Sequence, residues 1–181
     1  MRINISTTQS LNGVYCKENG ESLQLSSTEH QKWVHQMRNI HDAILVFGNT
    51  LLNDNPNLSV RLSESQQIYN SIIKQSVNHG IKYCIIIDKT LKTLDNPNFL
   101  ELNIFKNTKY QFIFIHNSDY HDKIIMPNLS YRITYIDYNT LKLPYITLEY
   151  LKYCLKLFDD KISSVWCEMG HRSLYRFLND S

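Results

Sequence analysis

The segment from Gly48 to Arg61 combines residue types that suit the binding of an anionic ligand. It directly follows the apolar run 43–47, which is typical of a buried strand. In open α/β sheets, ligands gather beyond the carboxyl ends of strands, where a glycine lets the backbone approach the ligand. Gly48 and Thr50 would then form a phosphate cradle. Asp54 would accept a hydrogen bond, and Arg61 would clamp an anion through paired N–H donors. The alternative is a plain turn around Asp54 with a solvated arginine.

A second apolar run ends in Glu168, Met169 and Gly170, just before a segment with helical spacing. Such an ending can present the Glu168 carboxylate to a ligand and the helix N-terminus to a phosphate. The alternative is a helix-capping region with a solvent-facing glutamate.

Motifs for other chemistries do not occur in the sequence. No G-x-G-x-x-G follows an apolar run, and G-x-S-x-G and the Walker A sequence are missing. The seven histidines include no H-E-x-x-H, and the sequence lacks the elements of a zinc deaminase. Cys16 stands apart, and the other cysteines lie in apolar runs, which predicts small buried hydrophobes: Cys84, Cys154 and Cys167. We therefore expect neither a metal site nor nucleophilic catalysis.

Composition and charge narrow the class of protein further. A formal net charge of +2 is far below the basic excess of a general nucleic-acid binder, so we expect no nucleic-acid partner. Hydrophobic residues make up 43% of the chain, yet no apolar run approaches the ~20 residues that span a bilayer. The N-terminus also lacks the apolar region of a secretory signal. We expect a single-domain protein of residues 1–181 in the cytoplasm, without membrane contact.

Short apolar runs alternate with amphipathic segments, which indicates strands alternating with helices. The expected strands cover 2–8, 42–47, 81–88, 110–116, 131–137 and 163–168. Thr28, with Gln31 three residues later, predicts a capped helix with Trp33, Val34, Met37 and Ile40 on one face. Thr147 predicts a second capped helix. Further helices are expected over 68–77 and after Gly170, the latter burying Leu174, Phe177 and Leu178.

The two candidate segments, in this order, resemble the reductase domain of riboflavin biosynthesis of the RibD C-terminal type. The matching elements are Ser10-Leu11-Asn12-Gly13, Gly20-Glu21-Ser22, Arg38, Asp42-Ala43-Ile44-Leu45-Val46, Gly48, Thr50, Asp54-Asn55-Pro56 and Leu58-Ser59-Val60-Arg61. The resemblance implies an α/β, dihydrofolate-reductase-like three-layer sandwich with a mostly parallel central sheet. It also implies that the family's final C-terminal strands and an attached deaminase domain are missing, and that the protein forms a homodimer.

Members of this family reduce a phosphoribosylamino-pyrimidine with NADPH. The resemblance places substrate contacts on Ser22, Arg38, Leu58, Arg61 and Glu168. It places cofactor contacts on Thr8, Gln24, Gly48, Thr50, Asp54 and Gly170. Arg61, alone or with Arg38, would hold the ribose 5-phosphate. No residue is assigned to acid, base or nucleophilic catalysis, because hydride transfer depends mainly on positioning.

Four positions depart from the family pattern. Ser6 stands where the family has a lysine, Asn12 where it has an aspartate, Gln24 where it has a tryptophan, and Met169 where it has a glycine. These differences support an alternative in which the chain is a non-catalytic nucleotide-binding or regulatory module. A reductase of another substrate, such as a pterin, is a third interpretation, since one fold hosts several functions.

Overall fold

Parallel strands form the centre of the protein in its computed structural model, which describes residues 1–14, 16–18, 23–62, 82–124, 132–137, 146–157 and 161–178. The strands are β1 (Arg2–Ser6), β2 (Ala43–Phe47), β3 (Lys82–Ile87), β4 (Tyr110–His116), β5 (Ile133–Asp137) and β6 (Ser164–Glu168). Within this described part they form one sheet in the order β1-β6-β2-β3-β4-β5, with every neighbouring pair parallel. All six expected strands are confirmed, with ends that shift by one or two residues.

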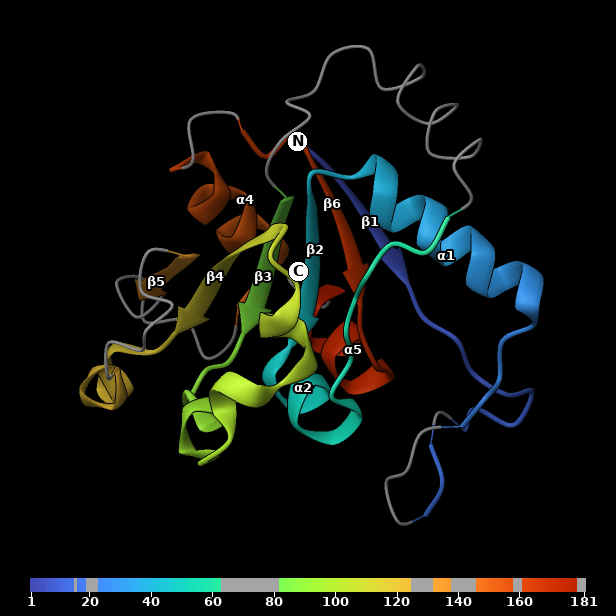
Figure 1. The fold of residues 1–181 in the computed structure, drawn as a ribbon, viewed down its shortest axis with the longest axis horizontal. Coiled ribbons are helices and arrows are strands. Elements are labelled where there is room, and N and C mark those ends of the chain that lie inside the picture. The colour runs from blue at the N-terminus through green and yellow to red at the C-terminus, as the bar shows by residue number, and fades with distance from the viewer. Residues whose placement is uncertain are drawn as a thin grey trace.

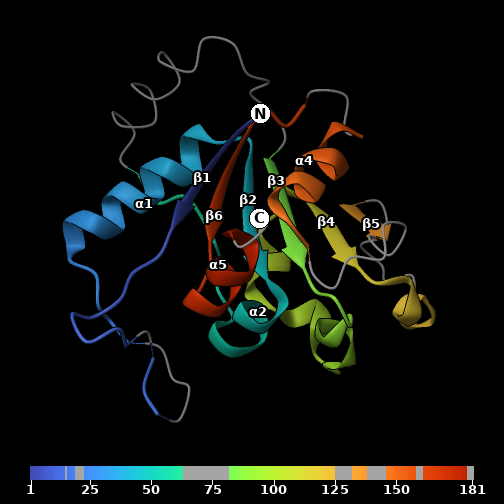
Figure 2. The ribbon, with the colours of Figure 1, turned by 180° about the vertical axis from the view of Figure 1, so that it is seen from behind.

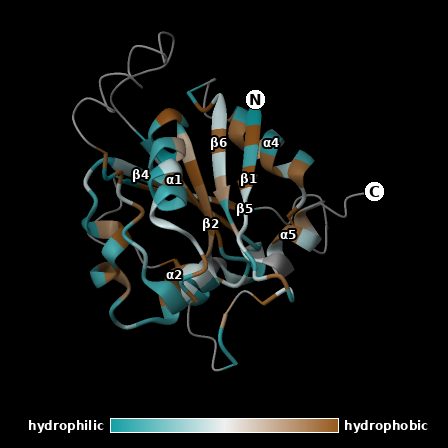
Figure 3. Cartoon of the chain, turned by 90° about the vertical axis from the view of Figure 1, so that its right-hand side faces the viewer, coloured by the Kyte–Doolittle hydropathy of each residue, from teal (hydrophilic) through white to brown (hydrophobic). Residues whose placement is uncertain are grey.

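The sheet is covered on both faces, which gives three layers (Figures 1 and 2). In β2, Ala43 and Leu45 belong to the core on one face, while Ile44 and Val46 belong to the core on the other. Because successive side chains of a strand alternate, an uninterrupted apolar run supplies both cores at once. In Figure 3, β2 is coloured as hydrophobic, whereas α1, on the surface, is largely hydrophilic.

Helices α4 (Leu148–Lys156) and α5 (His171–Leu178) supply the first core, with Leu151, Leu155 and Phe177 buried. The second core lies under α2 (Gly48–Asp54) and three 3₁₀ helices, η1 (Lys92–Asp95), η2 (Phe99–Glu101) and η3 (Asn103–Lys106). A further 3₁₀ helix, η4 (Ser118–Lys123), follows β4.

The N-cap of helix α1 (Thr28–Ile40) lies one residue before the expected N-cap. Ser27, not Thr28, is the N-cap, and its hydroxyl accepts a hydrogen bond from the N–H of His30 at 3.2 Å. The Thr28–Gln31 capping box was therefore wrong, because the neighbouring Ser27 satisfies the free N–H group. The Thr147 cap of α4 is confirmed, since its hydroxyl accepts from the N–H of Tyr150 at 3.1 Å. The helix expected over 68–77 lies outside the described residues.

The predicted apolar face of α1 is only partly covered. No residue of this helix is fully buried, and Trp33 remains 42% exposed. The Trp33 ring packs edge-on against the buried Trp166 of β6, with ring centroids 5.3 Å apart. Helix α1 therefore rests on β6 through an aromatic contact rather than through a closed apolar core.

Two buried polar contacts fix the amino ends of the strands and the end of α1. The Lys82 ammonium donates to three backbone carbonyls at the end of α1, those of Arg38, Asn39 and His41, at 2.6–2.9 Å. One carboxylate oxygen of Asp42 accepts hydrogen bonds from the backbone and side chains of Ser163 and Ser164. These contacts hold α1 and β6 in place on either side of β2.

The expected burial of three cysteines is confirmed: Cys84, Cys154 and Cys167 are buried, whereas Cys16 is exposed. Burial raises the pKa of the Cys167 thiol to about 12. Across the described ranges, no three His, Cys, Asp or Glu side chains lie close enough to hold a metal ion. None of the described helices is both long and apolar enough to cross a membrane.

Candidate functional site

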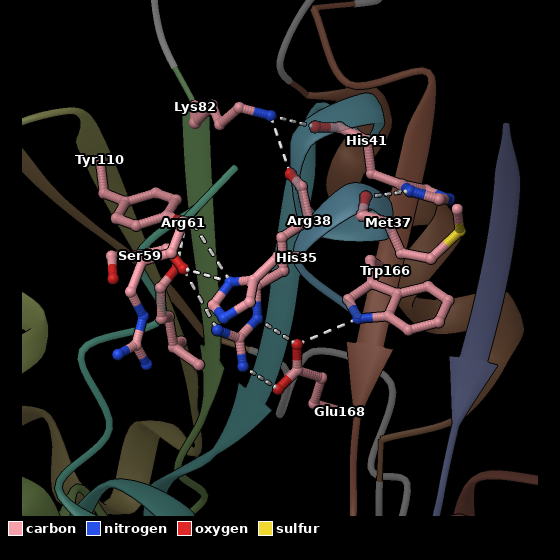
Figure 4. Close-up of polar contacts among 11 residues, drawn as sticks. His35, Met37, Arg38, His41, Ser59, Arg61, Lys82, Tyr110, Trp166 and Glu168 are labelled. Atoms are coloured by element: carbon pink, nitrogen blue, oxygen red, sulfur yellow. Dashed lines mark hydrogen bonds and ion pairs between the residues drawn. The ribbon is translucent and has the colours of Figure 1, made fainter. Parts of the chain in front are cut away.

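A bidentate ion pair joins α1 to the carboxyl end of β6. Arg38 Nε donates to Glu168 Oε1 at 2.6 Å, and its Nη2 donates to Oε2 at 2.8 Å (Figure 4). The side chains are only 14% and 22% exposed. Burial disfavours the charged guanidinium, but the hydrogen bonds and the charge of Glu168 outweigh this effect, so the pKa of Arg38 is raised. The pair is therefore a fixed element of the site, held by two hydrogen bonds in parallel.

Trp166 gives Glu168 a third donor. The indole Nε1 donates to Glu168 Oε1 at 3.0 Å, from the same face of β6 two residues earlier. Ser6 lies opposite Glu168 in the register of β1 and β6. Ser6 carries no charge, and the positive charge in contact with Glu168 comes from Arg38.

The segment 55–62, which we call the strap, connects α2 to the region of this ion pair. Leu58 has a positive φ of 53° and is buried, and its carbonyl accepts a hydrogen bond from the Tyr110 hydroxyl at 2.8 Å. Further along, the Ser59 carbonyl accepts from Arg38 Nη1 at 3.3 Å. The strap is thus fixed to β4 on one side and to α1 on the other.

His35 makes a second link between α1 and the strap. Its Nδ1 lies 3.0 Å from the Ser59 carbonyl oxygen and 3.3 Å from the Arg61 backbone nitrogen. His35 precedes Arg38 by one helical turn, so both side chains leave α1 on the same side. The contacts of this site thereby connect four residues: His35, Arg38, Ser59 and Arg61.

Arg61 differs from Arg38 in its environment. It is exposed, and within the described residues its guanidinium forms no hydrogen bond or ion pair, although its backbone N–H is used by His35. Figure 4 shows it apart from the Arg38–Glu168 pair. Arg61 therefore has its donors available for an anion, whereas Arg38 already uses its donors on Glu168.

The chain forms a helix after β2, α2, which begins at Gly48 itself and was not among the predicted helices. A Cβ at Gly48 would lie 2.7 Å from Asp88 Cγ, so the glycine is needed for close packing against this carboxylate. The Asp88 carboxylate in turn accepts from the N–H groups of Lys92 and Thr93 at the start of η1. The Gly48 backbone thus lies close to a protein side chain, and its predicted approach to a ligand stays a prediction.

Gly170 has open space beside it. A Cβ at this position would meet no atom within 4 Å, in contrast to Gly48. The preceding Met169 is 5% exposed and belongs to the core on the side of α4 and α5. The Met169 side chain is therefore packed in the core rather than exposed to solvent.

The remaining expected site residues lie farther along the surface or outside the description. Thr8 and Gln24 stand between β1 and α1, with Thr8 half-buried and Gln24 exposed. Thr50 is half-buried on α2, and Asp54 is exposed at its end. Ser22 lies outside the described residues.

The protein-family comparison decides the relationship. The model of the RibD C-terminal domain matches residues 2–178. The chain belongs to the RibD C-terminal domain family. No curated protein matches the sequence significantly.

Solved structures with the same fold agree with this family. One is a diaminohydroxyphosphoribosylaminopyrimidine deaminase/5-amino-6-(5-phosphoribosylamino)uracil reductase from Thermotoga maritima, with a TM-score of 0.63 and 22% identity. The match covers 94% of this chain and 39% of that one. Two forms of Acinetobacter baumannii RibD match with TM-scores of 0.65 and 0.62, at 18% and 17% identity. They cover 98% and 95% of this chain, and 42% and 40% of theirs. The chain thus spans well under half of these proteins, and the dihydrofolate-reductase-like α/β fold is confirmed.

Sequence reasoning missed three residues that build the site: His35, Tyr110 and Trp166. Two of them carried a usable signal, because His35 lies three residues before Arg38 on a helix and Trp166 two before Glu168 on a strand. Tyr110 carried none, since its partner is a backbone carbonyl far away in the sequence.

Proposed function

We propose that this protein reduces a phosphoribosylamino-pyrimidine of riboflavin biosynthesis, such as 5-amino-6-(5-phosphoribosylamino)uracil, with NADPH. Membership of the RibD C-terminal domain family supports a riboflavin-pathway reductase. The observation that carries the substrate assignment is the exposed guanidinium of Arg61, which has no hydrogen bond or ion pair within the described residues, on the strap that Arg38 and His35 hold to α1. A free arginine next to a rigid, charged framework is suited to a sugar phosphate.

In this proposal the two arginines have different roles. Arg61 binds the 5-phosphate through paired N–H donors, because its side chain is exposed and unengaged. Arg38 keeps Glu168 oriented, so that the carboxylate can accept hydrogen bonds from the N–H groups of the base. Ser22 and the strap around Leu58 complete the expected substrate contacts.

The described residues fit a dinucleotide phosphate near α5. The open space beside Gly170 leaves room for a ligand against the backbone. The first N–H groups of a helix have no partner within it, and the N-terminus of α5 favours a phosphate. Thr8, Gln24, Thr50 and Asp54 would make the further contacts, whereas Gly48 contributes through its packing on Asp88. When bound, NADPH supplies the hydride, and the protein contributes orientation and exclusion of water.

The non-catalytic alternative loses one of its supports. A side chain in place of the family's glycine would argue against cofactor binding if it filled the Gly170 space, but Met169 is packed in the core. Ser6 and Gln24 remain as differences from the family pattern. Turnover with the pyrimidine substrate separates these two functions directly.

The test begins with titration of NADPH into the purified protein while nicotinamide fluorescence is followed. NADPH oxidation is then measured with the phosphorylated uracil and, in parallel, with a pterin. We expect saturable binding and turnover of the uracil, and Arg61→Ala should raise KM by at least ~10-fold, since charged hydrogen bonds are lost. Arg2→Ala, an exposed arginine at the amino end of β1, is the matched control and should behave like wild type.

Three outcomes would contradict the proposal. Absence of NADPH binding excludes the reductase, and binding without any turnover supports the regulatory module. Turnover of the pterin alone assigns another substrate. Light scattering across concentrations, on the same samples, tests the expected homodimer.

A further inference from the structure

We propose that His35 is a positioning residue, which holds the strap so that Arg61 faces the substrate phosphate. The proposal rests on the proposed function for the identity of the ligand, but its geometric basis does not. His35 lies on α1, makes no covalent contribution to the reaction, and acts only through the Arg61 backbone.

The geometry places one ring nitrogen between two groups of the strap backbone. Nδ1 of His35 is 3.0 Å from the Ser59 carbonyl oxygen and 3.3 Å from the Arg61 nitrogen. An unprotonated Nδ1 accepts the hydrogen bond from the Arg61 N–H, whereas a protonated Nδ1 donates to the carbonyl. Either bond ties the strap to α1, and the Arg61 N–H is held directly only in the first state.

The surroundings of His35 favour its neutral form. Partial burial, and then the positive charge of Arg38, lower the pKa of His35, and Arg61 acts in the same direction. The Ser59 carbonyl and the Glu168 carboxylate act the opposite way but do not prevail. A neutral imidazole is therefore favoured, and in this form Nδ1 either accepts from the Arg61 N–H or, in the other tautomer, donates to the Ser59 carbonyl.

The position of Arg61 depends on this contact because its side chain has no other anchor. Within the described residues the Arg61 guanidinium has no hydrogen-bond partner. The position of the Arg61 backbone therefore determines where this side chain can reach. The next anchor toward α2 is Leu58, through Tyr110. Loss of the His35 ring would leave Ser59 held by Arg38 and would release the Arg61 backbone.

The test is a double-mutant cycle of His35→Ala with Arg61→Ala, read as KM for the phosphorylated uracil. In the wild-type background we expect His35→Ala to raise this KM about fivefold, the effect of one hydrogen bond, with kcat and the KM for NADPH within about twofold. In the Arg61→Ala background it should have no further effect on KM. Gln36→Ala on the same helix is the control and should leave KM unchanged. An equal effect of His35→Ala in both backgrounds, or no effect in either, would overturn the proposal.

A second measurement does not depend on turnover. Backbone hydrogen exchange of a peptide covering 58–62 should speed up in His35→Ala and stay at the wild-type rate in Gln36→Ala. Unchanged exchange would refute the positioning role even if the enzyme is active, whereas faster exchange with no turnover would refute only the proposed function. If His35→Ala fails to fold, His35→Gln replaces it, and the same two readouts decide the matter.

Discussion

The Arg38–Glu168 pair allows a quantitative test of how the site is held together. Glu168→Gln keeps the shape of the side chain but removes its charge and one acceptor, so an amide N–H group would face a guanidinium N–H group. A hydrogen bond to a charged group contributes about 1.5–3 kcal/mol, and breaking a fully buried pair costs about 3–5 kcal/mol. Because these side chains are still 14% and 22% exposed, we expect a loss smaller than that of a fully buried pair, about 2–3 kcal/mol.

Urea denaturation at neutral pH measures this loss as a lower midpoint with an unchanged slope. A separate double-mutant cycle compares the single variants Arg38→Ala and Glu168→Ala with the double variant Arg38→Ala/Glu168→Ala. We expect a coupling energy of at least ~1.5 kcal/mol, so the double variant should be clearly more stable than the sum of the single losses implies. A coupling below ~0.5 kcal/mol, the value of a solvent-exposed pair, would refute the view that this pair is a rigid part of the site.

Four further predictions follow from individual contacts. Lys82→Met should destabilise the protein by about 2 kcal/mol in urea, because three carbonyls at the end of α1 lose their charged donor; a loss below ~0.5 kcal/mol would contradict this. Gly48→Ala should cost about 1–3 kcal/mol through its clash, while Gly170→Ala should leave the midpoint unchanged; equal midpoints would be inconsistent with the packing described. A thiol reagent should modify only Cys16 in the native protein and all four cysteines in denaturant, as counted by mass spectrometry. The pKa of His35 is lowered in the folded state, so the unfolded state binds more protons. The free energy of unfolding should therefore fall as pH drops through ~6.5, and His35→Gln should remove this part of the pH dependence.

The strands could be predicted from the sequence because a strand buried on both faces is a continuous apolar run. The run Ala43 to Phe47 needed no tertiary information, since both sides of β2 meet apolar cores. The start of α1 was misplaced by one residue because Ser27 and Thr28 are both good caps, and only the backbone conformation selects between them. Helix α2 was not predicted because its residues, rich in Asn and beginning with Gly, have low helix propensity.

The candidate site was only half accessible to sequence reasoning. Arg38 and Glu168 were both named as substrate contacts, but they are separated by 130 residues, and nothing in their local sequence indicates that they bind each other. The same holds for Gly48, where the partner that demands a glycine is Asp88 on the neighbouring strand. Pairings of this kind depend on strand order, which alternation of apolar runs does not specify.

The place of β6 in the sheet has a consequence for how the chain reaches this structure. β6 lies between β1 and β2, so the strand nearest the N-terminus obtains its neighbour from a strand near the other end of the chain. Until β6 arrives, β2 presents an unpaired edge, and such edges are open to association with other chains. Contacts over so long a sequence separation also slow folding, because the entropy of loop closure must be overcome first. Insertion of β6 also brings Glu168 to Arg38, so the ion pair of the site can form only once β6 is paired with its neighbours, and its formation would report this step.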